Sequence, residues 1–284
     1  MTHLAIIGAG AAGLAAARSL RQRRPDLAIT VFEKSRGLGG RVATRRRDGF
    51  VFDHGAQNLR APTPALEQLL TSALAADTLH DIGLPVWLFD AAGTLAQGDP
   101  AQNAEAKWIY RDGLNRLGKL LAAGIDVRRE VRVGRIAGAA GGRAPFTLFD
   151  TNGAPLGTAD MVLFTAPAPQ SADILAASAL DESLKATLLA ELGRARYRRC
   201  ISLALAYPRR IERPFYALLN SDRAHPISWL ALEHSKAPER CPPGHSLIIA
   251  QMAPAWSVEH WDTPPDALQE QIAPLVAALL GDAL

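Results

Sequence analysis

The sequence predicts an α/β fold, in which a parallel sheet is joined by a second, discontinuous α+β domain built on a mostly antiparallel sheet. Residues 4–33 have the pattern of a strand, a helix and a second strand, with glycines at the first junction. Residues 62–107 leave that pattern, and from about residue 195 apolar and polar residues alternate as in antiparallel strands. A chain of 284 residues is long enough for two such domains with a sizeable core.

The first three elements form a β-α-β unit. Leu4 to Ile7 is a short apolar run, as expected for a strand buried on both faces of a parallel sheet. From Ala12 onward the apolar residues recur with helical period until Pro25 stops the helix. Residues 28–33, AITVFE, then form a second strand that ends in a carboxylate.

The opening residues, IIGAGAAGLAAARSL, are also open to interpretation as a secretory leader or a buried apolar helix. A leader needs an unbroken apolar run, whereas three glycines interrupt this one and Arg18 follows soon after. No segment reaches the roughly 18 uninterrupted apolar residues that a membrane span needs. We therefore expect a cytoplasmic protein without a membrane partner.

The glycines at the first junction predict a dinucleotide site. Gly8 permits a tight turn, Gly10 lets the backbone approach a pyrophosphate, and Gly13 lets the helix pack closely on the strand. The amides at the helix N-terminus would meet the phosphates. Glu33 stands where an acid can accept hydrogen bonds from the adenosine ribose. A glycine turn that serves packing alone is the alternative.

Composition excludes several classes of protein. The net charge of +3 is spread over the chain, and we interpret the arginine clusters at 45–47 and 194–199 as solvated or anion-facing surface, with no nucleic-acid partner. Cys200 and Cys241 are expected to be core thiols in a reducing compartment. Neither the cysteines nor the histidines have the spacing of metal ligands. We expect no metal.

The segment after Glu33, KSRGLGGRVATRR, offers a second close backbone approach at Gly39 and Gly40 with Arg41 beside it. Here the chain resembles the flavoproteins that include monoamine oxidases, protoporphyrinogen oxidases and phytoene desaturases. Residues 52–59, FDHGAQNL, resemble the renalase version of the element that follows, and later segments resemble bacterial renalase-like proteins in order and spacing. The resemblance implies a Rossmann-like domain that binds FAD.

The resemblance also implies individual cofactor contacts. Near the pyrophosphate, the adenosine ribose and the adenine it implies Gly8, Gly10, Ala12, Gly13, Glu33, Lys34, Gly40, Arg41 and Val131. Against the ribityl chain and the flavin ring it implies His54, Gly55, Ala56, Gln57 and Asn58. Thr165 and Pro167 would lie in a loop that returns to the cofactor, although Thr165 also fits an ordinary strand end.

The remaining segments complete two domains. We predict an FAD-binding domain of residues 1–61, 108–194 and 262–284, and a substrate domain of residues 62–107 and 195–261. Asn152-Gly153 predicts a hairpin turn. The aromatic residues Trp87, Trp108, Trp229, Tyr216 and Trp256 are interpreted either as core or as a flat wall for a planar substrate.

The resemblance implies an FAD-dependent oxidase. The substrate would be a small molecule, most simply a misreduced dihydronicotinamide isomer of NAD(P)H, oxidised to NAD(P)+ with O2 as acceptor and H2O2 as co-product. No catalytic side chain is identified, and Gln57 and Trp229 are candidates for the substrate pocket. An amine or polyamine oxidase on the same scaffold is one alternative. A nucleotide-binding protein without turnover is another.

The resemblance further implies a longer chain, which would continue through a strand ending in Gly-Asp and a final helix at the flavin. Gly281-Asp282 could be that motif, but IAPLVAALL before it has helical period, so Gly281 is expected to be a helix C-cap. The sequence is then either truncated or lacks part of the flavin cradle. In the second case we expect weak FAD retention and low turnover.

Overall fold

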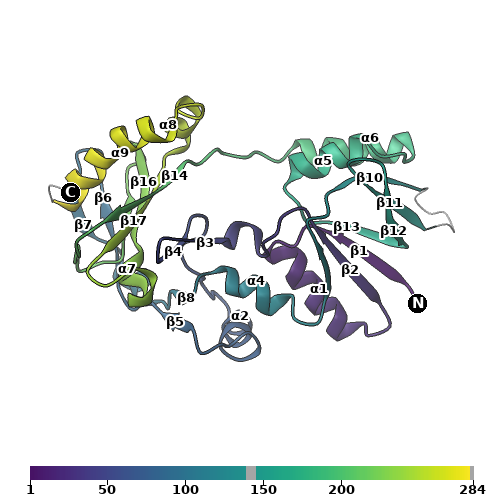
Figure 1. Cartoon of the computed structure of the whole chain (residues 1–284), viewed down its shortest axis with the longest axis horizontal. Coiled ribbons are helices and arrows are strands. Elements are labelled where there is room, and N and C mark those ends of the chain that lie inside the picture. The colour runs from purple at the N-terminus through teal and green to yellow at the C-terminus, as the bar shows by residue number, and fades with distance from the viewer. Residues whose placement is uncertain (139–144, 282–284) are drawn as a thin grey trace. The chain divides into compact units, whose positions relative to one another are not determined.

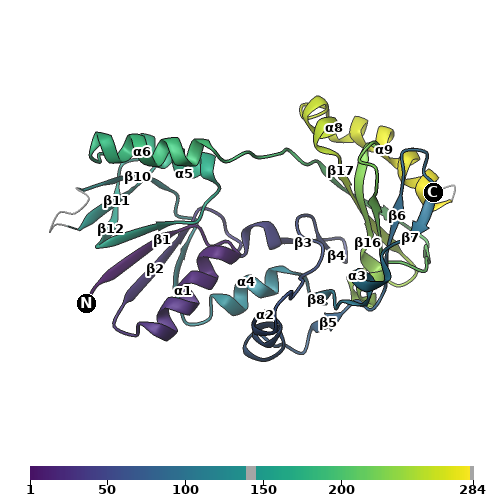
Figure 2. The same cartoon turned by 180° about the vertical axis from the view of Figure 1, so that it is seen from behind.

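The computed structural model describes residues 1–138 and 145–281. The chain divides into two compact units, each assembled from two separate segments (Figures 1 and 2). The first unit contains residues 1–42 and 115–197, and the second contains residues 43–114 and 198–284. The predicted α/β fold with a parallel sheet and a second, mostly antiparallel sheet is confirmed.

The first unit is built on a four-stranded parallel sheet in the order β13-β1-β2-β9. Its strands are β1 (His3–Ile7), β2 (Ala28–Glu33), β9 (Asp126–Arg129) and β13 (Met161–Phe164). Helix α1 (Ala11–Arg23) packs on β1 and β2 through Leu14 and Ala17, and α4 (Asn115–Leu121) packs on α1. The predicted β-α-β unit is therefore present.

A second layer covers the other face of this sheet. It contains the antiparallel strands β10 (Val133–Ala137), β11 (Phe146–Asp150) and β12 (Pro155–Ala159), followed by α5 (Ala168–Ala176) and α6 (Glu182–Gly193) (Figure 1). Ala5, Ile7 and Phe32 share a core with Val133 and Leu148 of this layer. The turn between β11 and β12 has Gly153 at φ 86°, as the Asn152-Gly153 pair predicts.

The second unit is built on a six-stranded sheet in the order β14-β17-β16-β15-β6-β7. Its strands are β6 (Val86–Phe89), β7 (Leu95–Gln97), β14 (Ser202–Tyr207), β15 (Ala217–Asn220), β16 (Ile227–Leu232) and β17 (Ser246–Met252). All neighbours are antiparallel except β6 and β15. The pairing of β6 with β15 joins the two segments of the unit.

Helix α9 (Pro265–Leu280) covers one face of the six-stranded sheet. Leu268, Ile272, Val276 and Leu279 form its apolar stripe and pack into the core of that sheet. We predicted residues 262–284 in the first domain, but this packing places α9 in the second unit, together with residues 43–61 and 108–114. Gly281 ends the helix at φ 66°, which confirms the predicted C-cap, and Asp282 lies outside the described residues.

Short elements complete the two units. The first unit also contains η1 (Gly40–Val42), and the second contains strand pairs β3 (Thr44–Arg47) with β4 (Phe50–Asp53) and β5 (Leu79–Asp81) with β8 (Trp108–Tyr110). Its remaining helices are α2 (Pro64–Gln68), η2 (Leu69–Ala73), α3 (Pro100–Ala104), α7 (Glu233–Lys236), η3 (Pro238–Arg240) and α8 (Pro254–Glu259). Within the described ranges no helix is long and apolar enough to cross a membrane.

The two cysteines differ in their surroundings. Cys241 is buried, and burial raises the pKa of its thiol to about 11. Cys200 is exposed, so the prediction that both thiols lie in a core was wrong for this one. It lies just before β14, and the neighbouring Ile201 packs against the core of the six-stranded sheet.

Candidate functional site

The first unit contains a cavity of about 540 Å³ at the carboxyl ends of β1, β2 and β13. Sites for nucleotides in open parallel sheets lie at this edge. Predicted residues that line the cavity are Gly8, Gly10, Ala12, Glu33, Lys34, Gly40, Arg41, Val131, Thr165 and Pro167. The structure thus brings together most of the residues that the sequence assigned to a dinucleotide.

The glycine turn between β1 and α1 leaves no room for side chains at two of its three positions. Gly8 has φ 112°, a conformation that favours glycine. A Cβ at Gly13 would lie 2.1 Å from the carbonyl oxygen of Gly8 and 2.6 Å from Oγ1 of Thr165. Gly13 does not line the cavity, so its role is to let α1 pack against the turn.

Gly10 differs from the other two glycines. A Cβ at this position would meet no protein atom within 4 Å, and Gly10 is the N-cap of α1. The first turn of α1 has no acidic residue, so the positive end of the helix dipole is not neutralised by its own side chains. The absence of a side chain at Gly10 therefore leaves the helix N-terminus open to an anion.

Glu33 ends β2 at the wall of the cavity. Its Oε2 accepts a hydrogen bond from the amide of Ala9 at 2.8 Å, and its Oε1 accepts one from the amide of Ser35 at 2.8 Å. A carboxylate has about four acceptor positions. The two amides hold the carboxylate in place and leave acceptor capacity for the hydroxyls of a ribose.

The second glycine pair packs directly on the first turn. The amide of Gly39 donates to the carbonyl oxygen of Ala9 at 2.9 Å, and a Cβ on Gly40 would lie 3.2 Å from Cα of Gly10. Both glycines have positive φ. This contact brings Arg41 to the cavity, where a guanidinium can bind a phosphate.

The opposite wall of the cavity comes from β13, α5 and the segment before β10. The hydroxyl of Thr165 donates to the carbonyl oxygen of Gly8 at 2.9 Å, so this residue both lines the cavity and holds the glycine turn. Pro167 is the N-cap of α5. Val131 donates its amide to the carbonyl oxygen of Glu33 at 3.0 Å, and Lys34 Nζ donates to Oε1 of Gln170 at 2.9 Å.

The residues predicted to lie against a flavin ring belong to the second unit. They are His54, Gly55, Ala56, Gln57 and Asn58, which follow β4, and none of them lines the cavity of the first unit. Gln57 is buried, and its Nε2 donates to the carbonyl oxygens of Asp53 and Gly55. Asn58 Nδ2 donates to the hydroxyl of Tyr216 at 2.9 Å. Their contacts with a cofactor remain predictions.

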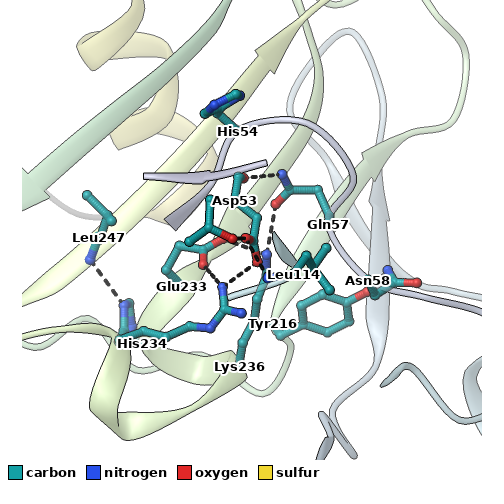
Figure 3. A network of polar contacts seen from close by, with 12 residues as sticks. Asp53, His54, Gln57, Asn58, Leu114, Tyr216, Glu233, His234, Lys236 and Leu247 are labelled. Atoms are coloured by element: carbon teal, nitrogen blue, oxygen red, sulfur yellow. Dashed lines mark hydrogen bonds and ion pairs between the residues drawn. The ribbon is translucent and has the colours of Figure 1, made fainter. Parts of the chain in front are cut away.

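Sequence reasoning missed a buried ionic network beneath this loop (Figure 3). The side chains of Asp53, Glu233, Lys236 and Arg240 are fully buried. Arg240 donates to Asp53 Oδ2 at 2.7 Å and also to Glu233, while Lys236 Nζ donates to Glu233 Oε1 at 2.5 Å. Two carboxylates and two cations balance the charge of the network.

The network fixes the loop at residues 53–57 through several elements. Lys236 Nζ also donates to Gln57 Oε1 at 2.9 Å, and Asp53 Oδ1 accepts from the amide of Leu114 at 3.0 Å and the hydroxyl of Thr44 at 2.5 Å. Burial lowers the pKa of Lys236, and the carboxylate of Glu233 opposes this shift. The loop is thus tied to α7 by a buried cation.

The aromatic residues of the second unit do not form one wall. Trp87 packs against Phe215 at a centroid distance of 5.3 Å, and Trp256 stacks on His260 at 3.9 Å; both adjoin the core under α9. Tyr216 is fully buried and meets Trp229 edge to face at 6.2 Å. Core packing therefore accounts for Trp87 and Trp256, while Trp229 and Tyr216 form a separate pair.

Two families of known proteins match this chain, one in its N-terminal segment and one over most of the rest. The family described as NAD(P)-binding Rossmann-like domain matches residues 6–73, and the family described as flavin containing amine oxidoreductase matches residues 84–284. Over 55 residues the chain is 40% identical to coproporphyrinogen III oxidase of Staphylococcus aureus, which is 19% of this chain and 12% of that protein. Over 59 residues it is 41% identical to 4,4'-diapophytoene desaturase of Staphylococcus haemolyticus, covering 21% and 11% of the two chains.

Solved structures with the same fold have low sequence identity to this chain. Putrescine oxidase bound to putrescine superposes with a TM-score of 0.73 at 14% identity, covering 98% of this chain and 81% of that one. A CLA-producing fatty acid isomerase from P. acnes superposes with a TM-score of 0.70 at 13% identity, covering 99% and 83%. These similarities establish the fold, and they come from proteins with different reactions.

Proposed function

This chain belongs to the family of flavin-containing amine oxidoreductases, and from that premise we propose that it is a renalase-like oxidase of misreduced dihydronicotinamides. Its cofactor is FAD. The observation that carries the proposal is the cavity of the first unit, where an open helix N-terminus, a fixed carboxylate and a guanidinium line one space. These groups match the pyrophosphate and ribose of FAD.

The residues of this cavity bind and orient the cofactor. The amides at the start of α1 and the guanidinium of Arg41 would hold the pyrophosphate, and Glu33 would accept hydrogen bonds from the adenosine ribose. When bound, FAD supplies a two-electron acceptor that takes hydride from carbon and is reoxidised by dioxygen. The donor becomes NAD(P)+, and dioxygen combines with the hydride equivalent and one solvent proton to give H2O2.

A dihydronicotinamide is proposed as the donor because its oxidation needs no strong base. The buried carboxylates Asp53 and Glu233 are paired with Arg240 and Lys236, so they are poor general bases. Burial also raises the pKa of Tyr216, which keeps its hydroxyl neutral. Hydride loss from a dihydronicotinamide requires only that the donor be held in place.

Gly10→Ala tests the cofactor site. Since its Cβ would meet no protein atom, we expect the variant to keep the stability of the parent protein. The methyl group would stand where the pyrophosphate approaches, so FAD affinity should fall at least about tenfold. Gly37→Ala is the matched control, because its Cβ also meets no protein atom and Gly37 does not line the cavity. Equal FAD affinity in both variants, measured by flavin fluorescence, would refute the site.

The donor is tested by mixing the FAD-loaded protein with candidate donors without oxygen. Loss of the yellow colour with misreduced dihydronicotinamide isomers of NAD(P)H, followed by peroxide formation under air, is the expected result. Bleaching by putrescine or benzylamine alone would instead identify an amine oxidase. Bound flavin that no donor bleaches would identify a nucleotide-binding protein without turnover.

A further inference from the structure

Four side chains form a row across the six-stranded sheet of the second unit, and we call them the Trp229 row. Leu88 pairs with Leu219, Leu219 pairs with Trp229, and Trp229 pairs with Gln251. Directly paired residues of neighbouring strands point to the same face of a sheet. Leu218, Leu230 and Ala250, which alternate with them, belong to the core under α9. The Trp229 row therefore lies on the opposite face.

This face is not fully covered by the second unit. Leu219 is 42% exposed, which is high for a leucine in the middle of a sheet, and the other three members of the row are partly exposed. Gln251 Nε2 donates to the carbonyl oxygen of Gly55 at 2.7 Å, so the loop after β4 borders the row. Small-molecule sites are lined mainly by apolar side chains with a few polar groups, and the residues of this face have that composition.

Trp229 contributes an unsatisfied hydrogen-bond donor to this face. Its indole nitrogen is buried and has no acceptor among the described residues. The ring of Tyr216 packs edge to face against the indole ring, with the ring centroids 6.2 Å apart and the ring planes at 64°. A buried donor without a partner is rare, because it loses its hydrogen bond to water and gains none in return. The indole N–H is therefore available to an acceptor outside the described residues, a water molecule or a ligand.

The charges of the second unit identify the kind of acceptor. No member of the Trp229 row carries a carboxylate, and the buried carboxylates Asp53 and Glu233 are bound to Arg240 and Lys236. An ammonium group would have no anionic partner in the row, and it has no lone pair to accept from the indole N–H. An uncharged planar ring with a carbonyl group satisfies both the apolar surface and the donor.

We infer that Trp229 determines substrate specificity by donating its indole N–H to the carboxamide oxygen of a dihydronicotinamide. The inference rests on the proposed function and narrows it, because it names the group that distinguishes a dihydronicotinamide from an alkylamine. Leu219 and Leu88 supply the apolar surface for the ring.

The test uses the FAD-loaded protein, and nicotinamide and benzylamine as probes. Trp229→Phe keeps an aromatic ring and removes the indole N–H donor. The chain has five tryptophans, and the indole signal that is absent from the ¹H–¹⁵N spectrum of this variant is that of Trp229. We expect that signal to shift downfield with nicotinamide and not with benzylamine. No shift with nicotinamide, or an equal shift with benzylamine, overturns the inference.

Kinetics provide a second readout. Trp229→Phe should raise KM for the dihydronicotinamide about fivefold to tenfold, as expected for the loss of one hydrogen bond, with kcat changed less. Trp87→Phe is the matched control, since Trp87 lies in the core under α9, and it should leave KM unchanged. If dihydronicotinamides reduce the flavin but Trp229→Phe has the KM of the parent protein, the inference fails and the proposed function stands. If they do not reduce the flavin, the proposed function fails, and the nicotinamide titration still decides whether Trp229 is a carboxamide donor.

Discussion

The ammonium nitrogen of Lys236 lies 2.9 Å from Oε1 of Gln57, and both side chains are buried. The two residues are 179 positions apart in the chain. The same ammonium group binds Glu233, so one cation joins the loop after β4 to helix α7. Because the network is charge-balanced and closed to water, removal of one member leaves the charges of the others unbalanced in a buried site.

Lys236→Met should destabilise the second unit strongly. Without Lys236, the buried carboxylates of Asp53 and Glu233 share Arg240 as the one cation of the network, which leaves a negative charge uncompensated. Loss of one partner from a buried pair costs about 3–5 kcal/mol. Urea denaturation measures the free energy of unfolding. Arg24→Met is the control, because Arg24 and Asp26 form an exposed pair on the first unit, and its loss should change little.

The double variant Lys236→Met/Glu233→Gln should recover part of that loss. It removes one cation together with one carboxylate, and leaves Arg240 paired with Asp53. If the double variant is less stable than Lys236→Met, the contact between Arg240 and the Glu233 carboxylate contributes more to stability than the balance of charge in the network.

Gly13→Ala should disrupt the first unit even without cofactor. The added Cβ would lie 2.1 Å from the carbonyl oxygen of Gly8, a backbone atom, so the turn itself would have to shift. We expect a large loss of stability in thermal or urea denaturation, whereas Gly10→Ala unfolds like the parent protein. Similar stability of both variants would contradict the packing role assigned to Gly13.

Glu33→Gln should weaken both the glycine turn and the cofactor site. Glutamine has one carbonyl oxygen, so it can accept from the amide of Ala9 or of Ser35 but leaves the other without its acceptor. We expect a loss of about 1–3 kcal/mol in unfolding free energy and an FAD affinity lower by about tenfold. Glu191→Gln, on the exposed surface of α6, is the comparison variant and should change neither quantity.

The second unit should lose stability in mild acid through His234. Its Nε2 contacts the carbonyl oxygen of Ile211 and its Nδ1 accepts from the amide of Leu247, and burial lowers its pKa. The unfolded chain binds a proton near pH 6.5, whereas the folded chain binds it only at lower pH. Unfolding free energy should therefore fall as the pH drops below about 6.5. Denaturation of His234→Gln between pH 7 and 5 should show a shallower pH dependence.

The glycine turn and the first strands could be predicted because each residue there has a local reason. Gly8, Gly13 and Glu33 act within one β-α-β unit, so their spacing alone carries the information. The amphipathic pattern of α9 likewise predicted a helix. It could not predict which sheet the helix covers, because an apolar stripe says only that some surface must be buried.

The ionic network could not be predicted from local sequence. Glu233 and Lys236 are three residues apart, a spacing that usually indicates an exposed pair on a helix surface. Only the fold brings Asp53 beside Arg240, at a separation of 187 residues. The unsatisfied indole of Trp229 is likewise a property of its three-dimensional surroundings and has no signal in the sequence.

Each unit is assembled from two separate stretches of the chain, and this has a consequence for synthesis on the ribosome. Residues 43–114 emerge before the first unit is complete at residue 197, yet β6 must wait for β15, whose Asn220 donates to Phe89 across 131 residues. During translation, therefore, the apolar strand β6 is exposed until β15 has been synthesised. Such intermediates are prone to aggregation. Production of this protein should therefore benefit from slow elongation and from chaperones that shield nascent strands.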